Sequence, residues 1–377
     1  MDYAALALEK HKLLRGKISI QNKDVLDTKE QLSTYYSPGV GAVSSFLAEH
    51  PEETPNYTWT NNCVAVISDG SAVLGLGNLG PQGALPVMEG KAMLFKHFAG
   101  IDGIPIVLDV HSADEIVAAV TAIAPSFGGI NLEDIAAPQC FEIEERLKST
   151  LSIPVMHDDQ HGTAIVTLAG LINACRITNR DIHDLKVVLV GSGAAGTAVA
   201  RLLYTYAQVE IICVDSQGIV SRGRQAINDE KAKLLEFTNP HNVEGDLAAA
   251  VKGADVFIGV SHAGILTAEM VASMAPDPII FAMANPIPEI MPEIALQAGA
   301  AIVATGRSDY PNQVNNALAF PGIFRGALDN RVKTITDEHK MRAAEVIANL
   351  VEEPTTTMIV PSVSDERLVS AIANIIV

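Results

Sequence analysis

The stretch that decides the fold is Val187-Val188-Leu189-Val190-Gly191-Ser192-Gly193-Ala194-Ala195-Gly196. Its first four residues are apolar and predict a buried strand, and a GxGxxG string follows at once. The next residues, 197–203, have helical character, so the pattern is strand, turn and helix. In that context the glycines permit a tight turn, and the amino end of the helix faces a pyrophosphate. The stretch therefore predicts the dinucleotide-binding turn of a doubly wound α/β domain.

A carboxylate ends the next apolar run. Asp215 stands 24 residues after Gly191, where its side chain can accept hydrogen bonds from the hydroxyls of the adenosine ribose. Arg222 and Arg224 lie close behind it and could hold a 2′-phosphate instead. We therefore expect NAD as the cofactor, with NADP possible.

A second GxGxxG string lies earlier, at Gly75-Leu76-Gly77-Asn78-Leu79-Gly80. It is followed by Pro81-Gln82-Gly83, which we interpret as a poor start for a long helix. The string alone is a weak signal. We expect a structural turn here, or backbone packed around a substrate, and not a second dinucleotide site.

Strand-like and helix-like segments alternate along the chain. Predicted strands are 64–67, 104–110, 129–132, 153–156, 186–190, 209–215, 255–260, 278–283 and 301–305. Predicted helices are 88–98, 113–123, 138–148, 162–175, 194–206, 246–252, 267–274, 338–351 and 366–376. Such alternation predicts parallel sheets covered by helices on both faces. We expect an α/β protein with two parallel-sheet domains, the second of Rossmann type, and helical segments at both ends.

The composition excludes several classes of partner. Hydrophobic residues make up 48% and charged residues 19%, which is typical of a globular protein. The formal net charge of −18 argues against nucleic acid and anionic membranes, because both select basic surfaces. No run reaches the roughly 18 apolar residues of a membrane span, and the start lacks the features of a signal peptide. The four cysteines are far apart, which favours neither a zinc site nor a redox motif. We expect a cytoplasmic protein.

Two acidic pairs follow predicted strands of the first domain. Glu133-Asp134 comes directly after one strand, and Asp158-Asp159 comes soon after the next. Carboxylates at neighbouring strand ends can meet at one point, where they repel each other unless a cation joins them. Mg²⁺ and Mn²⁺ prefer such oxygen ligands. Each pair alone could equally stand at a helix N-terminus, but together they favour a metal site, from which we leave out His157 and His161.

The length of the chain calls for two domains, because 377 residues exceed what one core usually supports. We predict that residues 1–160 bind substrate and metal, that residues 161–330 bind the dinucleotide, and that residues 331–377 form C-terminal helices. The segment 162–175 is apolar and rich in small residues, so we expect a buried helix that bridges the two domains.

A few isolated polar residues could carry chemistry. Lys91 lies in an apolar helical stretch, where it either extends to solvent or is held in a cleft. A desolvated lysine near a metal has a lowered pKa and can act as a base near neutral pH. Tyr36 precedes a turn and could simply cover it. Asn285 follows an apolar run, and Asn315-Asn316 stands in a polar string. These asparagines could cap loops, or they could hold a carboxylate or a carboxamide.

Together these strings resemble the malic enzymes, specifically the short bacterial type. The matching motifs run in the family's order along nearly the whole chain. They are Tyr36-Ser37-Pro38-Gly39-Val40, the stretch from Ser68-Asp69-Gly70 to Gly80, Glu89-Gly90-Lys91, Leu132-Glu133-Asp134, Asp158-Asp159-Gln160-His161-Gly162-Thr163, Gly191–Gly196, Ala284-Asn285-Pro286, and Asn315-Asn316 followed by Phe320-Pro321-Gly322.

The resemblance implies oxidative decarboxylation of L-malate to pyruvate and CO₂, with a nicotinamide cofactor and Mg²⁺ or Mn²⁺. By position in the motifs, Glu133, Asp134 and Asp159 match the metal ligands. Lys91 matches the general base, and Tyr36 matches the general acid. The resemblance also implies a homodimer, which could form through the N-terminal helices.

The resemblance further implies which residues touch the organic ligands. Asn285 and Asn316 match residues that contact the substrate, Asn315 is adjacent to them, and Lys91 reaches the same molecule. The cofactor contacts that we predict are Thr163, Gly191, Ser192, Gly193, Ala194, Ala195, Gly196, Asp215 and Asn285.

The chain departs from the family at one position. Larger malic enzymes carry an arginine shortly after the Asp-Gly pair that corresponds to Asp69-Gly70, and here the position is Ala72. The residue that binds the second malate carboxylate is therefore open, and Arg307 is one candidate. Two other functions are alternatives: a malolactic conversion of malate to lactate with tightly held NAD, and a regulator that binds NAD without catalysis.

Overall fold

The computed structural model describes residues 3–110, 112–225 and 227–377. The first of its two sheets is parallel throughout, with its strands in the order β2-β1-β3-β4. Its strands are β1 (Cys63–Ser68), β2 (Asp102–Val107), β3 (Gly129–Leu132) and β4 (Val155–His157). The strands β1, β3 and β4 are buried along their whole length, as the continuous apolar runs predict.

The second sheet has the order β10-β9-β8-β5-β6-β7, and only β7 runs antiparallel to its neighbour. Its strands are β5 (Lys186–Val190), β6 (Glu210–Asp215), β7 (Gly218–Ile219), β8 (Val256–Gly259), β9 (Ile279–Ala282) and β10 (Ile302–Thr305). From β5 the chain adds β6 and β7 on one side of the sheet and then β8, β9 and β10 on the other. The point between β5 and β8 is therefore the switch in strand order, where ligands bind in doubly wound folds. The predicted fold class is confirmed.

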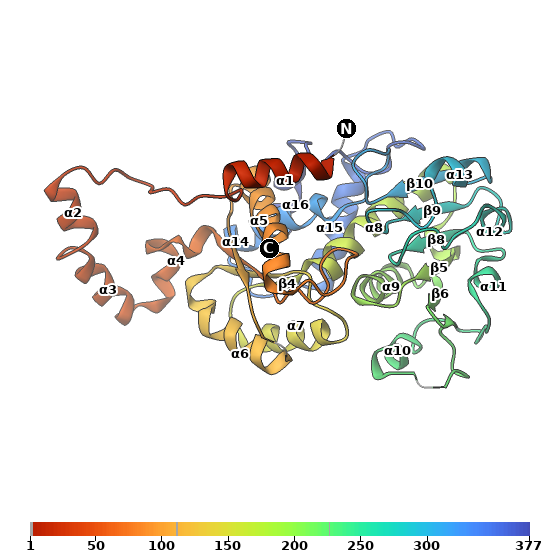
Figure 1. The fold of residues 1–377 in the computed structure, drawn as a ribbon, viewed down its shortest axis with the longest axis horizontal. Helices are drawn as coiled ribbons and strands as arrows, with labels where there is room; N and C mark the ends of the chain where they lie inside the picture. The colour runs from red at the N-terminus through yellow and green to blue at the C-terminus, as the bar shows by residue number, and fades with distance from the viewer. Residues whose placement is uncertain (1–2, 111, 226) are drawn as a thin grey trace.

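Helices cover both sheets, and Figure 1 shows the two sheets side by side with α8 passing from one to the other. The helices that pack around the sheets are α5 (Gly80–Ala99), α6 (Ala113–Ile123), α7 (Gln139–Thr150), α8 (Asp158–Thr178), α9 (Ala194–Ala207), α10 (Asp229–Leu234), α11 (Leu247–Val251), α12 (Ala268–Ala272), α13 (Pro292–Gln297), α14 (Phe320–Asp329), α15 (Asp337–Asn349) and α16 (Leu368–Ala373).

One helix connects the two sheets. The 21-residue α8 begins at the second acidic pair, directly after β4, and most of its length is buried. Its side chains belong to a hydrophobic core that also contains Val64 and Val66 of the first sheet and Val187 and Leu189 of the second. The predicted bridging helix therefore exists, but it starts four residues earlier than expected, so the acidic pair forms its first turn.

The N-terminal segment is the most exposed part of the described chain, and its helices α2 and α3 stand apart from the body. It contains α1 (Tyr3–Leu14), α2 (Lys29–Tyr35), α3 (Val40–Glu49) and α4 (Thr54–Tyr57), and none of these helices has a buried residue. Figure 1 shows α2 and α3 projecting from the side of the body on an extended segment. We refer to residues 18–57 as the N-terminal arm.

Several sequence-based expectations differ from the structure. The string at 75–80 leads into α5, a helix of 20 residues, so Pro81 was wrongly taken as a poor start. Proline is tolerated in a first helical turn because the amide there needs no partner. The short elements β7, α10 and α13 and the helix α14 were missed. Within the described ranges, no helix has the length and apolar character needed to cross a membrane.

Candidate active site

A buried lysine lies among carboxylates at the carboxyl ends of β3 and β4. The Nζ atom of Lys91, on α5, is 2.8 Å from Oε1 of Glu133 and 2.6 Å from Oδ2 of Asp158. All three side chains are more than nine-tenths buried. The ammonium group also lies 4.3 Å from the centroid of the Phe320 ring. The cleft position that we considered for Lys91 is therefore the one that the structure shows.

The predicted metal ligands lie next to this lysine. Asp134 and Asp159 are in contact, because the backbone N–H of Asp134 donates to Oδ2 of Asp159 over 2.7 Å. The Oδ1 atom of Asp134 accepts a hydrogen bond from the backbone N–H of Leu74. The Oδ2 atom of Asp134 is buried and has no partner among the described residues. Within that part of the chain no three acidic, histidine or cysteine side chains are already arranged around a common point.

The donor set fits a hard divalent cation. Glu133, Asp134 and Asp159 offer only carboxylate oxygens, which Mg²⁺ and Mn²⁺ prefer. A buried carboxylate oxygen without a partner, such as Oδ2 of Asp134, is costly, and a cation would remove that cost. These three residues would hold the ion.

Burial dominates the acid–base properties of the carboxylates. It raises the pKa of Asp134 to about 8, that of Asp158 to about 7 and that of Asp159 to about 6. Burial also raises the pKa of Glu133. The carboxylates repel one another in the absence of a cation, and a bound cation would favour their ionised forms.

Without a metal, the acidic neighbours of Lys91 decide the direction of its pKa. Burial lowers the pKa of Lys91, but the charges of Asp158, Glu133 and Asp159 outweigh burial and raise it above the ordinary value. The ammonium form is therefore held in place by its acidic neighbours. A cation bound to the same carboxylates would reduce their stabilisation of the ammonium form and so lower the pKa of Lys91.

These pKa shifts predict that Mn²⁺ stabilises the protein more as pH rises. Raised carboxyl pKa values contribute stability that is complete below the unfolded value of about 4 and is lost as pH rises toward about 8 for Asp134. Without metal, the Tm should fall between about pH 5.5 and pH 8, and Mn²⁺ should offset that fall. Each kcal/mol corresponds to roughly 1–1.5 °C for a chain of 377 residues.

Thermal unfolding with EDTA and with Mn²⁺ across this pH range measures the effect. Asp159→Asn serves as the matched variant, because it removes one predicted ligand and should lose most of the gain. A Tm gain that is the same at every pH would contradict the assignment of the cation to these carboxylates.

Asp158, which the sequence left as a capping carboxylate or one that supports the metal ligands, has a more specific partner in the structure. It is fully buried and pairs with Lys91 across 67 positions of sequence. The signal was Gly162, one helical turn later. A Cβ atom at Gly162 would overlap Oδ1 of Asp158 and lie 2.8 Å from Cβ of Asn316. Only glycine leaves room for the buried carboxylate at this turn.

The predicted substrate residues reach this region to different extents. Asn316 packs against the first turn of α8, close to Gly162. Asn315 caps the short 3₁₀ turn Asn316–Leu318 by accepting from the N–H of Ala317, so its side chain has a structural partner. Asn285 follows β9, and its carbonyl oxygen lies against Gly75 of the early glycine string. The string at 75–80 therefore borders the space between the two sheets.

Arg307 is already engaged. Its guanidinium pairs with Asp309 at 2.6 Å and donates to the carbonyl of Pro286 at 2.9 Å. Ala72, where larger relatives have arginine, donates its backbone N–H to the carbonyl oxygen of Asp134. Arg307 would have to give up its contact with Asp309 to bind a carboxylate.

The dinucleotide turn has the geometry that its sequence predicts. Gly191 has a φ of 105°, and a Cβ there would lie 2.7 Å from the carbonyl oxygen of Val260. A Cβ at Gly196 would overlap the carbonyl oxygen of Gly191. In contrast, the space in front of Gly193 is open, and this residue begins α9 without a side-chain cap. Free N–H groups at such an open helix start bind phosphate.

The residues of this turn surround the start of α9. Ser192 precedes the opening at Gly193, and Ala194 and Ala195 form the first turn of the helix. Thr163 lies on α8 one turn after Asp159, half-buried between the two ligand regions.

Asp215 ends β6, but its carboxylate is already paired with two basic side chains. Its Oδ2 is 3.0 Å from Nη2 of Arg224 and 2.5 Å from Nζ of Lys231. Burial raises the pKa of Asp215, but its hydrogen bonds with these cations outweigh burial and lower the pKa below the ordinary value. Arg222 instead donates to the carbonyls of Asn239 and Leu235, so it is not free to bind a phosphate.

Tyr36 is not brought to Lys91 within the chain. It follows α2 on the N-terminal arm and is 69% exposed. Figure 1 shows α2 and α3 well apart from α5 and β4, which carry the buried lysine and lead to the acidic pair. Whatever Tyr36 does in this site, it cannot do from the same chain in this conformation.

Comparisons with known proteins point to one family. A family model described as "Malic enzyme, NAD binding domain" matches residues 160–377, and "Malic enzyme, N-terminal domain" matches residues 15–114 and 111–148. The chain is 53% identical over 371 residues to the bifunctional malic/malolactic enzyme of Bacillus subtilis, covering 98% of this chain and 90% of that relative.

Two further comparisons agree. The chain is 53% identical over 364 residues to the NAD-dependent malic enzyme of Geobacillus stearothermophilus, covering 96% of this chain and 76% of that relative. The crystal structure of the NAD-dependent malic enzyme from Thermotoga maritima is similar with a TM-score of 0.95 and 48% identity, covering 98% of both chains.

Proposed function

The chain belongs to the malic enzyme family, and from this premise we propose that it oxidises and decarboxylates L-malate to pyruvate and CO₂. The cofactor is NAD or NADP, and the cation is Mg²⁺ or Mn²⁺. The observation that carries the proposal is the buried Lys91 in contact with Glu133 and Asp158, next to the predicted metal ligands. The second sheet supplies the open dinucleotide turn at Gly193. A regulator without catalysis is set aside, because the close relatives are named as enzymes.

Each residue of the site has a distinct part in this reaction. When bound, the cation would act as a Lewis acid at the C1 carboxylate and C2 oxygen, and the dinucleotide would accept hydride from C2. With positive charge on the neighbouring carboxylates, Lys91 would act as the neutral amine and take the proton of the C2 hydroxyl, becoming the ammonium. Asp158 orients the Lys91 side chain through the contact between its Oδ2 and Nζ. Asn285 and Asn316 orient the substrate. After loss of CO₂, the hydroxyl of Tyr36 returns a proton to C3.

The assay that tests this function supplies malate, Mn²⁺ and either dinucleotide. We expect reduced nicotinamide and free pyruvate in equal amounts, both abolished by a chelator. The name of the Bacillus subtilis relative keeps one alternative, the malolactic reaction. Formation of lactate without free NADH would support that alternative, and no product of either kind would refute the proposal.

We infer that Tyr36 reaches a Lys91 that belongs to a second copy of the chain. The N-terminal arm has no buried residue, yet it exposes a row of apolar side chains. These are Leu32, Tyr35, Tyr36, Val40, Val43 and Phe46, each between 37% and 69% exposed. Exposed apolar side chains gathered on two neighbouring helices are typical of an interface, and exchange of a segment between two copies is a known route to a two-fold dimer. The proposed homodimer would then contain two sites, each completed by the partner.

The environment of Asp215 favours use of both dinucleotides. A free carboxylate there would bind the ribose hydroxyls and repel a 2′-phosphate. Because Arg224 and Lys231 neutralise it, the repulsion is reduced. We propose NAD as the main cofactor, with NADP accepted.

Replacing Asp215 by alanine is expected to shift the preference toward NADP. The change removes the ribose acceptor and leaves the positive charges of Arg224 and Lys231 unbalanced. The ratio of kcat/KM for NADP to that for NAD should rise about tenfold or more, which corresponds to about 1.4 kcal/mol. Steady-state kinetics with both cofactors measures it, and Asp229→Asn, an exposed change on α10, should leave the ratio as it is. An unchanged ratio in Asp215→Ala would mean that this carboxylate does not contact the ribose.

A further inference from the structure

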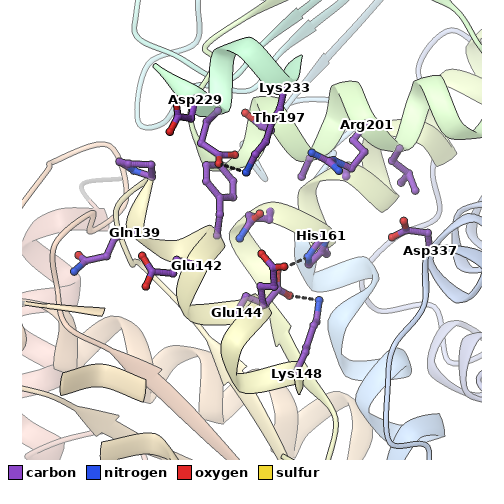
Figure 2. A pocket seen from close by; sticks show the side chains of 18 of the residues that line it. Gln139, Glu142, Glu144, Lys148, His161, Thr197, Arg201, Asp229, Lys233 and Asp337 are labelled. Carbon is purple, nitrogen blue, oxygen red and sulfur yellow. Dashed lines mark hydrogen bonds and ion pairs between the residues drawn. The ribbon is translucent and has the colours of Figure 1, made fainter. Parts of the chain in front are cut away.

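A single buried carboxylate, that of Glu144 on α7, contacts both ends of the turn that carries Asp158 and Asp159. Its Oε1 accepts from the backbone N–H of His157 at 3.0 Å, and its Oε2 lies 2.8 Å from Nε2 of His161. His157 is the last residue of β4, and His161 lies in the first turn of α8. The residues between them include Asp158 and Asp159. Figure 2 shows Glu144 pointing to His161, with a dashed line marking the contact.

Glu144 also forms an ion pair with a lysine on its own helix. Nζ of Lys148 is 2.6 Å from Oε1 of Glu144, and Figure 2 shows this pair beside a cavity of about 1220 Å³ between α7, α8, α9 and α15. Lys148 is partly exposed to that cavity, whereas Glu144 is almost fully buried. The lysine therefore supplies the charge that lets the carboxylate remain ionised inside the protein.

The charge of Glu144 is well compensated. Burial alone would raise its pKa, but His161 and Lys148 outweigh burial and hold the pKa well below its ordinary value. Burial and the nearby Lys340 keep His161 neutral, with its pKa lowered to about 4, although Glu144 opposes that shift. A neutral imidazole then donates its N–H to the carboxylate. Such an ionised acceptor with three donors is stronger and more directional than a neutral one.

Among the described residues, no N-cap side chain closes the start of α8. The N-cap residue of α8, His157, makes no side-chain hydrogen bond to the first turn. The turn nevertheless has to bear the mutual repulsion of Asp158, Asp159 and Glu133, which lie on its other side. A carboxylate at a helix N-terminus also gains from the helix dipole. Glu144 thus fixes the backbone of the turn that carries Asp158 and Asp159.

We propose that Glu144 is a positioning residue that sets the geometry of the metal site through the β4–α8 turn. It touches neither substrate nor metal; it fixes the backbone from which Asp158 and Asp159 extend. Residues that orient ligands in this way typically change metal affinity or activity by about 10–100-fold when replaced. This proposal rests on the proposed function, because it presumes that Glu133, Asp134 and Asp159 hold the cation.

The test measures Mn²⁺ binding directly, from the electron paramagnetic resonance signal of free Mn²⁺, without any assay of turnover. Glu144→Gln keeps the shape and one acceptor but loses the charge. It should weaken Mn²⁺ binding about tenfold or more, while the Kd for the dinucleotide stays as in the parent protein. Glu145→Gln is the matched control, since it makes the same change on the same helix at an exposed position. It should bind Mn²⁺ as tightly as the parent.

A second variant covers the case in which Glu144→Gln does not fold. His161→Asn removes one of the three donors and leaves the carboxylate with His157 and Lys148, so a smaller loss of Mn²⁺ affinity is expected. Unchanged Mn²⁺ affinity, within twofold, in a folded Glu144→Gln or His161→Asn protein would overturn the proposal. If the parent protein itself fails to bind Mn²⁺, the proposed function is overturned, and the role of Glu144 is lost with it.

Discussion

Lys91→Ala is expected to lower kcat by about 10²–10⁴-fold, the usual contribution of a positioned general base. The structure gives the reason, because Nζ of Lys91 is the only basic group among the described residues within ion-pair distance of Glu133 and Asp158. The Kd for the dinucleotide should stay as in the parent, since the GxGxxG turn lies on the other sheet. The turnover number at saturating malate and Mn²⁺ measures the loss.

The control for this variant lies on the same helix. Lys96→Ala removes an exposed lysine that pairs with Asp102, and it should keep nearly full turnover. Lys91→Ala also removes the ammonium group that pairs with the buried carboxylates of Glu133 and Asp158. The variant is therefore expected to need Mn²⁺ to reach the Tm of the parent protein. A folded Lys91→Ala protein with turnover within a few-fold of the parent would exclude Lys91 as the base.

Two inactive variants are expected to restore each other. Tyr36→Phe removes the proposed acid and Lys91→Ala the proposed base, so each homodimer should be nearly inactive. If Tyr36 acts across the dimer, a mixed dimer contains one site with both residues intact and one with neither. Mixed dimers isolated by two affinity tags should then show about half the turnover of the parent per dimer.

The same mixed dimer distinguishes the two arrangements. If Tyr36 served the Lys91 of its own chain, both sites of the mixed dimer would each lack one residue, and no activity would return. Dimers of two Tyr36→Phe chains carrying both tags, isolated in the same way, give the baseline. Loss of dimerisation when residues 18–57 are removed would further support the interface on the N-terminal arm.

The strands and the dinucleotide turn could be predicted because their signals are local. The apolar run at 186–190 and the glycines at 191–196 depend on neighbours within a few residues, and β5 and α9 lie where they were expected. The pairing of Lys91 with Asp158 could not be predicted, because it joins α5 to α8 through the packing of the whole first sheet.

Other features of the site could not be predicted from the sequence, for the same physical reason. The direction of the Lys91 pKa in the protein without metal depends on how many carboxylates surround it, which spacing along the chain does not reveal. In the proposed dimer, the position of Tyr36 would depend on a surface outside its own chain. Glu144 looks like any helical glutamate in the sequence, and only the approach of α7 to the start of α8 distinguishes it from the exposed Glu145.

The continuous core around α8 makes the two halves of the molecule thermodynamically dependent on each other. Because side chains from both sheets pack into one cluster, neither sheet can lose its packing without exposing apolar surface of the other. A cation bound at the first turn of α8 would therefore stabilise a helix whose core is shared with the strands of the second sheet. We expect any coupling between cation and dinucleotide to act through this shared core, and the Kd of the dinucleotide measured with and without Mn²⁺ gives its size.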